Sequence, residues 1–378
     1  MIITNASVYT EEGKFEKRDI YIKDTLFADS AKEAEDGQII DAAGCVAIPG
    51  LTDIHFHGCM GHDFCDGTRE AVDAMAAYEA SVGVTNIVPA SMTLSEEMLL
   101  GICSTAKAYR EEGLQEKRAH FQGINMEGPF VSVAKKGAQN AAYIYKPDGE
   151  MFARLNEASG NCVKLLDIAP EEEGGMELID EWHDRVVISL AHTCADYDTA
   201  REAFERGASH VTHLYNAMNP YTHRAPGLIG AAADEEKVQV ELICDGVHIH
   251  PAAVRTTFKI FGDDRIILIS DSMRATGLED GDYTLGGQDV KVTGSLATLK
   301  DGTIAGSVTN LLDCMRTAVL KMGIPLESAV KCAAVNPAKC VGIYDTCGSI
   351  TAGKTADVVL LGKEDLSLRQ VILRGRAL

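Results

Sequence analysis

The chain has 378 residues, of which 46% are hydrophobic and 24% are charged, and its formal net charge is −21. A chain of this length is expected to bury a large core and to form one large and one smaller globular domain. Such an acidic surface argues against nucleic acid or an anionic membrane as a partner, but it does not exclude a small anionic substrate.

Several features bear on where the protein resides. The N-terminal segment has no basic stretch followed by an apolar one, so we expect no signal peptide. No apolar run reaches the length of a membrane span. The 11 cysteines are scattered without a CxxC pair, which favours free thiols over a disulfide framework. Together these features predict a cytoplasmic protein.

Both ends of the chain have the character of β-strands. Residues 2–9 and 19–27 are expected strands separated by Gly and Asp turns, and residues 348–361 contain a turn that leads into an apolar strand. We therefore predict that residues 1–48 and 345–378 form one small β-sandwich domain. A larger domain, residues 49–344, would be inserted between them.

The central part alternates between apolar runs of strand length and stretches of good helix formers. Helices are expected at residues 70–80, 95–111 and 197–206. Eight such strand–helix units over about 250 residues predict a TIM-type (β/α)8 barrel in an α/β protein. A doubly wound open sheet is the alternative, but polar residues follow the ends of so many strands that the barrel is favoured. The eight expected strands are residues 51–56, 83–88, 120–125, 163–168, 186–191, 209–212, 238–243 and 265–270.

Histidines and acids follow five of the eight expected strands. His55 and His57 share one face of an extended strand, and this spacing suits a divalent transition metal, although the HxH pattern alone is a weak signal. Glu127 follows the third strand, where the next residues, Gly-Pro-Phe, make a solvated loop tip less favoured. His192 and His213 follow the fifth and sixth strands. With Glu127 they form a His₂Glu set, which leaves a metal position open for water.

Asp271 follows the eighth strand and is the candidate general base. Beside a metal-bound water, a carboxylate at this position could accept the proton of the nucleophile. The competing interpretation is that Asp271 caps the following helix.

These residues resemble those of the N-acetylglucosamine-6-phosphate deacetylases of the amidohydrolase superfamily, and the resemblance covers nearly the whole chain. The HLYNAM segment at residues 213–218 is specific to these deacetylases, whereas PGLTDIH, which starts at residue 49, is shared more widely. The other matching segments are residues 127–130, 191–193, 245–248, 270–273, 304–307 and 353–357.

The resemblance implies a metal centre and a sugar-phosphate site. Glu127, His192 and His213 would hold the main metal, and the presence of His55 and His57 implies the two-metal subtype. The metal would be zinc or iron, with one or two ions per subunit, and the protein would be a homodimer. Many members have a histidine at the position of Gln139, which can donate a hydrogen bond but no proton. The implied substrate-binding residues are Ala138, Gln139, Asn216, Ala217, Arg224, His248, Ile304, Ala305 and Gly306.

The expected reaction is hydrolysis of the acetamide of N-acetyl-D-glucosamine 6-phosphate to D-glucosamine 6-phosphate and acetate, in amino-sugar catabolism. A deacetylase of the galactosamine epimer is an alternative. So is another amidohydrolase, such as a cyclic amidase or deaminase, although the fourth strand ends without the lysine that many cyclic amidases carbamylate. A sugar-phosphate sensor without catalysis is disfavoured, because the expected ligands and base are all present.

Overall fold

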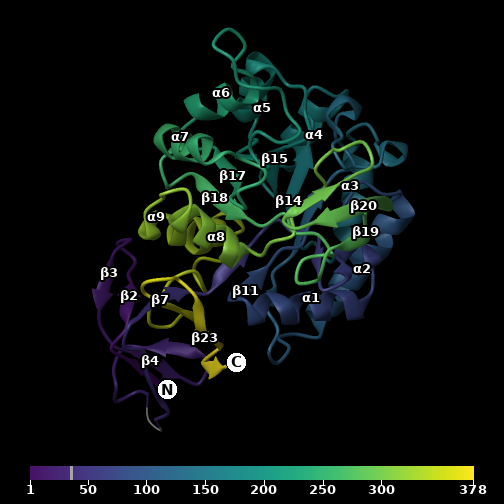
Figure 1. The fold of residues 1–378 in the computed structure, drawn as a ribbon. Coiled ribbons are helices and arrows are strands. Elements are labelled where there is room, and N and C mark those ends of the chain that lie inside the picture. Colours follow the sequence, from purple (N-terminus) through teal and green to yellow (C-terminus); the bar gives the residue numbers. More distant parts are fainter. Residues whose placement is uncertain (35–36) are drawn as a thin grey trace.

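The computed structural model describes residues 1–34 and 37–378. Figure 1 shows a large α/β region at one end and a group of sheets that contains both termini at the other. All eight strands expected in the central part are confirmed, and the third is divided into two short strands. The strands are β8 (Leu51–Asp53), β11 (Val84–Ile87), β12 (His120–Phe121), β13 (Ile124–Glu127), β14 (Val163–Ile168), β15 (Val187–Leu190), β16 (His210–Val211), β17 (Gln239–Ile243) and β18 (Ile266–Ile269).

These strands form a curled parallel sheet. β11 pairs with β8 and β12, and β13 to β18 pair in sequence order. A parallel bridge between Ala90 and Asn125 joins the two groups. At the other edge, Asp271 N–H donates to the carbonyl of His55 at 2.9 Å and His57 N–H donates to the carbonyl of Ser272 at 2.7 Å. The carboxyl ends of the first and last strands therefore lie side by side.

Helices follow the parallel strands and cover the outside of the sheet (Figure 1). The helices predicted at residues 70–80, 95–111 and 197–206 are confirmed as α1, α2 and α5. Side-chain caps start them: the oxygens of Thr68, Ser95 and Asp196 accept the N–H three residues ahead. The helices are α1 (Arg69–Ser81), α2 (Glu96–Glu111), α3 (Gly149–Ala158), α4 (Gly175–Trp182), α5 (Tyr197–Glu205), α6 (Gly227–Asp234), α7 (Pro251–Phe261), α8 (Leu311–Leu320), α9 (Leu326–Val330) and α10 (Asn336–Cys340).

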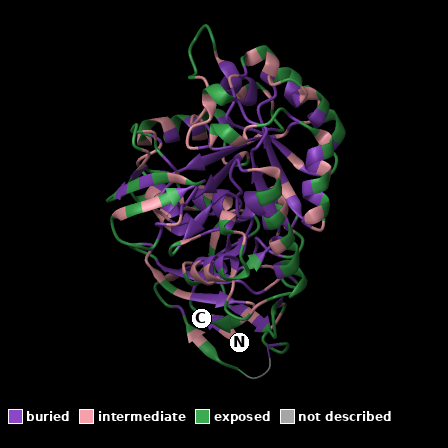
Figure 2. Cartoon of the chain, turned by 90° about the vertical axis from the view of Figure 1, so that its right-hand side faces the viewer, coloured by how far each residue is buried: buried purple, intermediate pink, exposed green. Residues whose placement is uncertain are grey.

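The burial pattern matches this layering. Figure 2 shows buried residues on the central strands and exposed residues on the outer faces of the helices. No helix in the described part of the chain is both long and apolar enough to cross a membrane. Short helical turns complete the region: η1 (Phe64–Asp66), η2 (Val133–Lys135), η3 (Ala141–Tyr143) and the π-helical η4 (Lys331–Val335).

A small antiparallel sheet, which the sequence analysis did not predict, lies between β18 and α8. It consists of β19 (Gly281–Leu285), β20 (Gln288–Thr293) and β21 (Leu296–Thr298), and β19 and β20 are joined at a Gly-Gly turn. A shorter hairpin of β9 (Gly58–Cys59) and β10 (His62–Asp63) follows the first parallel strand.

Two further sheets contain the chain ends. One has the order β5-β4-β1-β6 and the other β24-β23-β22-β7-β2-β3, so strands from both termini share the second sheet. Apolar side chains such as those of Ile3, Ile22 and Val358 form one buried cluster here. The strands are β1 (Ile2–Thr4), β2 (Ser7–Tyr9), β3 (Phe15–Lys17), β4 (Ile20–Lys23), β5 (Leu26–Ala28), β6 (Ile39–Asp41), β7 (Cys45–Pro49), β22 (Val358–Gly362), β23 (Leu368–Leu373) and β24 (Arg376–Ala377).

Two of the expected terminal strands are each divided in two. Residues 2–9 form β1 and β2, because Asn5 adopts a left-handed φ of 64° and the chain then enters the other sheet. Residues 19–27 form the hairpin of β4 and β5, with Asp24 at φ 54° in its turn. Asn and Asp tolerate this conformation better than other non-glycine residues.

Candidate metal centre and active-site cavity

The candidate ligands lie at the carboxyl ends of the parallel strands. Glu127 is the last residue of β13, while His55, His192, His213 and Asp271 each come two residues after the end of a strand. Three of these residues have a left-handed backbone: φ is 45° at His192, 29° at His213 and 48° at Asp271. Non-glycine residues adopt this conformation only where the surrounding structure holds them, and they cluster at functional sites.

Glu127, His192 and His213 form a first ligand group. Oε1 of Glu127 lies 3.0 Å from Nε2 of His192 and 3.1 Å from Nε2 of His213, and the two nitrogens are 3.2 Å apart. All three residues are buried. The structure thus brings together the His₂Glu set predicted from the sequence.

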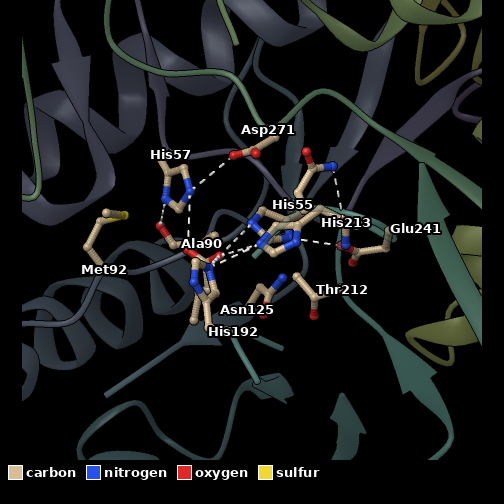
Figure 3. A network of polar contacts seen from close by, with 12 residues as sticks. His55, His57, Ala90, Met92, Asn125, His192, Thr212, His213, Glu241 and Asp271 are labelled. Atoms are coloured by element: carbon tan, nitrogen blue, oxygen red, sulfur yellow. Dashed lines mark hydrogen bonds and ion pairs between the residues drawn. The ribbon is translucent and has the colours of Figure 1, made fainter. Parts of the chain in front are cut away.

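His55, His57 and Asp271 form a second ligand group beside the first. Nε2 of His57 lies 3.3 Å from Oδ1 of Asp271 and 3.4 Å from Oε2 of Glu127. Nε2 of His55 lies 3.6 Å from Oε1 of Glu127. The carboxylate of Glu127 therefore lies between the two groups. Figure 3 shows the labelled histidines converging from different strands.

The outer ring nitrogens of three histidines are fixed by acceptors. Nδ1 of His192 lies 2.9 Å from the carbonyl of Lys135, and Nδ1 of His57 lies 3.3 Å from the carbonyl of Ala90. Nδ1 of His55 lies 3.0 Å from Oε2 of Glu241. A carbonyl or carboxylate at Nδ1 keeps the proton there, which leaves Nε2 free to bind a metal.

The charge balance of the site suits a divalent cation. Burial alone lowers the pKa of His55, but the charges of Glu241 and Glu127 outweigh it and raise that pKa well above its usual value. Burial alone raises the pKa of Glu127, but the adjacent imidazoles of His192 and His213 hold it well below its usual value. These carboxylates therefore attract positive charge into a buried site. Nε2 of His55 is also buried without a hydrogen-bond partner among the described residues, so the side chains fit a bound metal.

A cavity of about 290 Å³ opens above these two groups. Most of the predicted site residues line it, including Asn216, Ala217 and His248. His55 does not reach the cavity and is completely buried behind the other ligands, and Ala305 is also fully buried. The predicted residues in the lining are His57, Glu127, Ala138, Gln139, His192, His213, Asn216, Ala217, His248, Asp271, Ile304 and Gly306.

Arg224 lies apart from this set. It is exposed on the loop before α6, and its Nη1 contacts Nε2 of His223 at 2.9 Å. It is not among the residues that line the cavity. Within one copy of the chain, the structure therefore does not bring this predicted phosphate ligand to the other site residues.

Gln139 is held in one orientation by two hydrogen bonds. Its Oε1 accepts the backbone N–H of Thr93 at 2.7 Å, so its amide nitrogen must face the other way. That nitrogen donates to Oε2 of Glu127 at 2.7 Å. Gln139 is only 1% exposed, but it also lines the cavity. Its side chain therefore contacts the candidate ligand Glu127 from a position in the cavity wall.

Comparisons with known proteins agree with this geometry. The model of the Amidohydrolase family matches residues 46–378. The chain belongs to the amidohydrolase family. It is 36% identical to the N-acetylglucosamine-6-phosphate deacetylase of Bacillus subtilis (strain 168), over 99% of this chain and 96% of that protein. It is 30% identical to the N-acetylgalactosamine-6-phosphate deacetylase of Escherichia coli O157:H7, over 97% of this chain and 96% of that protein.

A solved structure resembles this amidohydrolase over its whole length. It is an alanine variant of N-acetyl-D-glucosamine-6-phosphate deacetylase from Mycobacterium smegmatis, in complex with N-acetyl-D-glucosamine 6-phosphate. The TM-score is 0.92 at 32% sequence identity, and the match covers 100% of this chain and 98% of that chain.

The sequence analysis missed the polar side chains beneath the ligands of this amidohydrolase. Glu241, Asp167 and His210 are completely buried in the parallel strands β17, β14 and β16. The available signal was a titratable residue inside an apolar strand. Burial of such a side chain costs free energy unless it is hydrogen-bonded or paired with a charge. Leu285, at the end of β19, also lines the cavity, and it belongs to the small sheet that was not predicted.

Proposed function

We propose that this amidohydrolase hydrolyses the acetamide of N-acetyl-D-glucosamine 6-phosphate to D-glucosamine 6-phosphate and acetate, a step of amino-sugar catabolism. The observation that carries the proposal is that residues of both ligand groups, among them the candidate base Asp271, line one cavity of about 290 Å³, near the lower end of the volumes of small-molecule sites. Full-length similarity to a Bacillus subtilis deacetylase with this substrate supports it.

The metal is a divalent transition ion, and we propose zinc or iron with one or two ions per subunit. Glu127, His192 and His213 would hold one ion, and His55 and His57 would hold a second with Glu127 shared between them. Held by these residues, such an ion would supply a Lewis acid that makes water more acidic and polarises the acetyl carbonyl.

The side chains then divide the remaining chemistry. Asp271 accepts a proton from the attacking water and delivers it to the departing amine. Its pKa supports this role: burial alone would raise it, but the hydrogen bond with His57 holds it below its usual value, so the carboxylate is ionised at neutral pH. Gln139 donates one amide hydrogen to Glu127, and its second hydrogen is available to the developing oxyanion.

Substrate recognition is assigned to the wall of the cavity. Ala138, Ile304 and Gly306 would form the apolar and backbone surface against the sugar, with the buried Ala305 behind them. Asn216, the backbone of Ala217, and His248 would contact the sugar phosphate. Arg224 would supply the strongest phosphate contact. Because its loop is exposed, its guanidinium would reach the cavity through loop movement or from a second copy of the chain.

We further propose the quaternary and domain arrangement. The curled sheet would be a TIM-type (β/α)8 barrel spanning residues 49–344, supported by the hydrogen bonds between the segments that directly follow its first and last strands. Residues 1–48 and 345–378 would form the small β-sandwich domain, supported by the shared sheet of the termini. The protein would act as a cytoplasmic homodimer, and its 11 unpaired cysteines suit a reducing compartment.

N-acetylgalactosamine 6-phosphate is the second candidate substrate, because a deacetylase of this epimer is 30% identical to the chain. The test is acetate release by protein of known metal content from both phosphorylated epimers and from unphosphorylated N-acetylglucosamine. Fast release from the phosphorylated glucosamine alone would support the proposal. Preference for the galactosamine epimer would make N-acetylgalactosamine 6-phosphate the substrate. No release from any of the three compounds would contradict both candidate substrates.

A further inference from the structure

Glu241 lies behind the metal centre, on a strand that contributes none of the candidate ligands. It belongs to β17 and is completely buried. Its Oε2 lies 3.0 Å from Nδ1 of His55 and accepts the backbone N–H of His213 at 3.1 Å. Figure 3 shows Glu241 on the side of these two histidines that faces away from His57 and Asp271. A single carboxylate oxygen therefore contacts both ligand groups.

The contact with His55 determines which ring nitrogen is available. A carboxylate accepts only, so Nδ1 of His55 carries the proton. Nε2 faces the centre, 3.6 Å from Oε1 of Glu127, and it is the nitrogen that gives up its proton when a metal binds. Because His55 is fully buried, no solvent can substitute for this acceptor. Glu241 thus orients His55 with Nε2 toward the centre.

The contact with His213 supports a strained turn. His213 has a φ of 29°, and its N–H is held by the side chain of Glu241. The next N–H, that of Leu214, donates to the backbone carbonyl of Glu241 at 2.9 Å. Glu241 therefore anchors this turn through both its side chain and its backbone.

We infer that Glu241 is a positioning residue that couples the two ligand groups, and that its charge strengthens metal binding in the group that contains His55. The inference rests on the proposed metal centre. Oε1 of Glu241 has no hydrogen-bond partner among the described residues, and the nearby Nε2 of His210 is 3.8 Å away. A glutamine can therefore keep its oxygen at the Oε2 position while its amide takes the place of Oε1. Glu241→Gln removes the charge and leaves the contacts to His55 and His213.

The test is a chelator titration of the holoenzyme, with the metal retained per chain measured by mass spectrometry. Replacement of residues that orient metal ligands weakens metal binding by about 10- to 100-fold. We expect Glu241→Gln to release one ion at an about tenfold lower chelator concentration, and Glu241→Ala to show a larger shift. The second ion should follow the wild-type curve in Glu241→Gln.

Asp167→Asn is the matched control. Asp167 is a fully buried carboxyl on β14 of the same sheet, and neither of its oxygens has a hydrogen-bond partner in the described structure. Because neither oxygen hydrogen-bonds to a candidate ligand, replacement by an amide of nearly the same size should leave the ligands in place. This variant should retain both ions with the wild-type chelator dependence.

The possible results distinguish the role of Glu241 from the proposed two-ion metal centre. Wild-type chelator dependence in folded Glu241→Gln, or equal loss of both ions in it, would overturn the inference alone. Wild-type protein that never holds two ions would overturn both the inference and the two-ion centre. If Glu241→Ala does not fold, Glu241→Gln still decides, with its thermal unfolding as the check on folding.

Discussion

Replacement of Asp271 by asparagine tests the proposed proton transfer most directly. Asparagine has nearly the same size and shape but cannot accept a proton from water. Asp271 is 8% exposed, and its Oδ1 is 3.3 Å from Nε2 of His57, so the variant should disturb the packing little. General acid–base catalysis contributes about 10²- to 10⁴-fold to a rate.

Because Asp271 would serve first as base and then as acid, we expect a loss of at least about 10³-fold in kcat, or about 4 kcal/mol in the activation barrier. The assay is acetate release from N-acetylglucosamine 6-phosphate by samples whose metal content has been measured. Substrate affinity, measured by calorimetry, should stay near that of the wild type. The reasoning is refuted if a metal-replete Asp271→Asn sample keeps kcat within tenfold of the wild type.

Three further predictions concern other parts of the molecule. Gln139→Ala leaves Thr93 N–H and Oε2 of Glu127 without their partner. The free energy of unfolding should therefore fall by about 1–3 kcal/mol, and kcat should fall as well. Unchanged values of both would contradict the assigned contacts. Arg224→Met should raise KM for the phosphorylated substrate by about 10- to 100-fold and affect kcat little, as expected for loss of a charged hydrogen bond. Burial raises the pKa of Asp357 to about 6, so its folded-state pKa lies above its unfolded value and its ionisation destabilises the fold as pH rises. Asp357→Asn should therefore gain about 3 kcal/mol of stability relative to the wild type between pH 4 and pH 7.5, and a pH-independent difference would refute this.

The eight parallel strands and the five strand ends with candidate ligands could be predicted because hydrophobic periodicity is a local signal. Runs such as those around β14 and β18 are apolar enough to be recognised one strand at a time. The small sheet of β19 to β21 was missed although its alternation and its Gly-Gly turn are also local signals. This sheet interrupts the strand–helix alternation after β18, and it places Leu285 in the cavity wall.

Other features depend on contacts that no local pattern encodes. The pairing of Glu241 with His55 joins residues 186 positions apart. The position of Arg224 outside the cavity depends on the path of a loop, which the motif around it does not determine. For Gln139 the residue type limits the chemistry to hydrogen bonding, but its orientation follows only from the N–H of Thr93.

The strained residues of the metal centre explain why its motifs are spread over so many strands. A left-handed φ at a non-glycine residue costs about 1–3 kcal/mol, and His192, His213 and Asp271 all have one. Each is held by a segment distant in sequence: Ser132 N–H donates to the carbonyl of His192 at 2.9 Å, Glu241 accepts the N–H of His213, and Asp271 N–H donates to the carbonyl of His55. A single hydrogen bond contributes about 1 kcal/mol net, so packing of the whole curled sheet must supply the rest. The ligand geometry is therefore a property of the assembled sheet, and damage to any one of these supporting contacts should affect metal binding before it affects the fold.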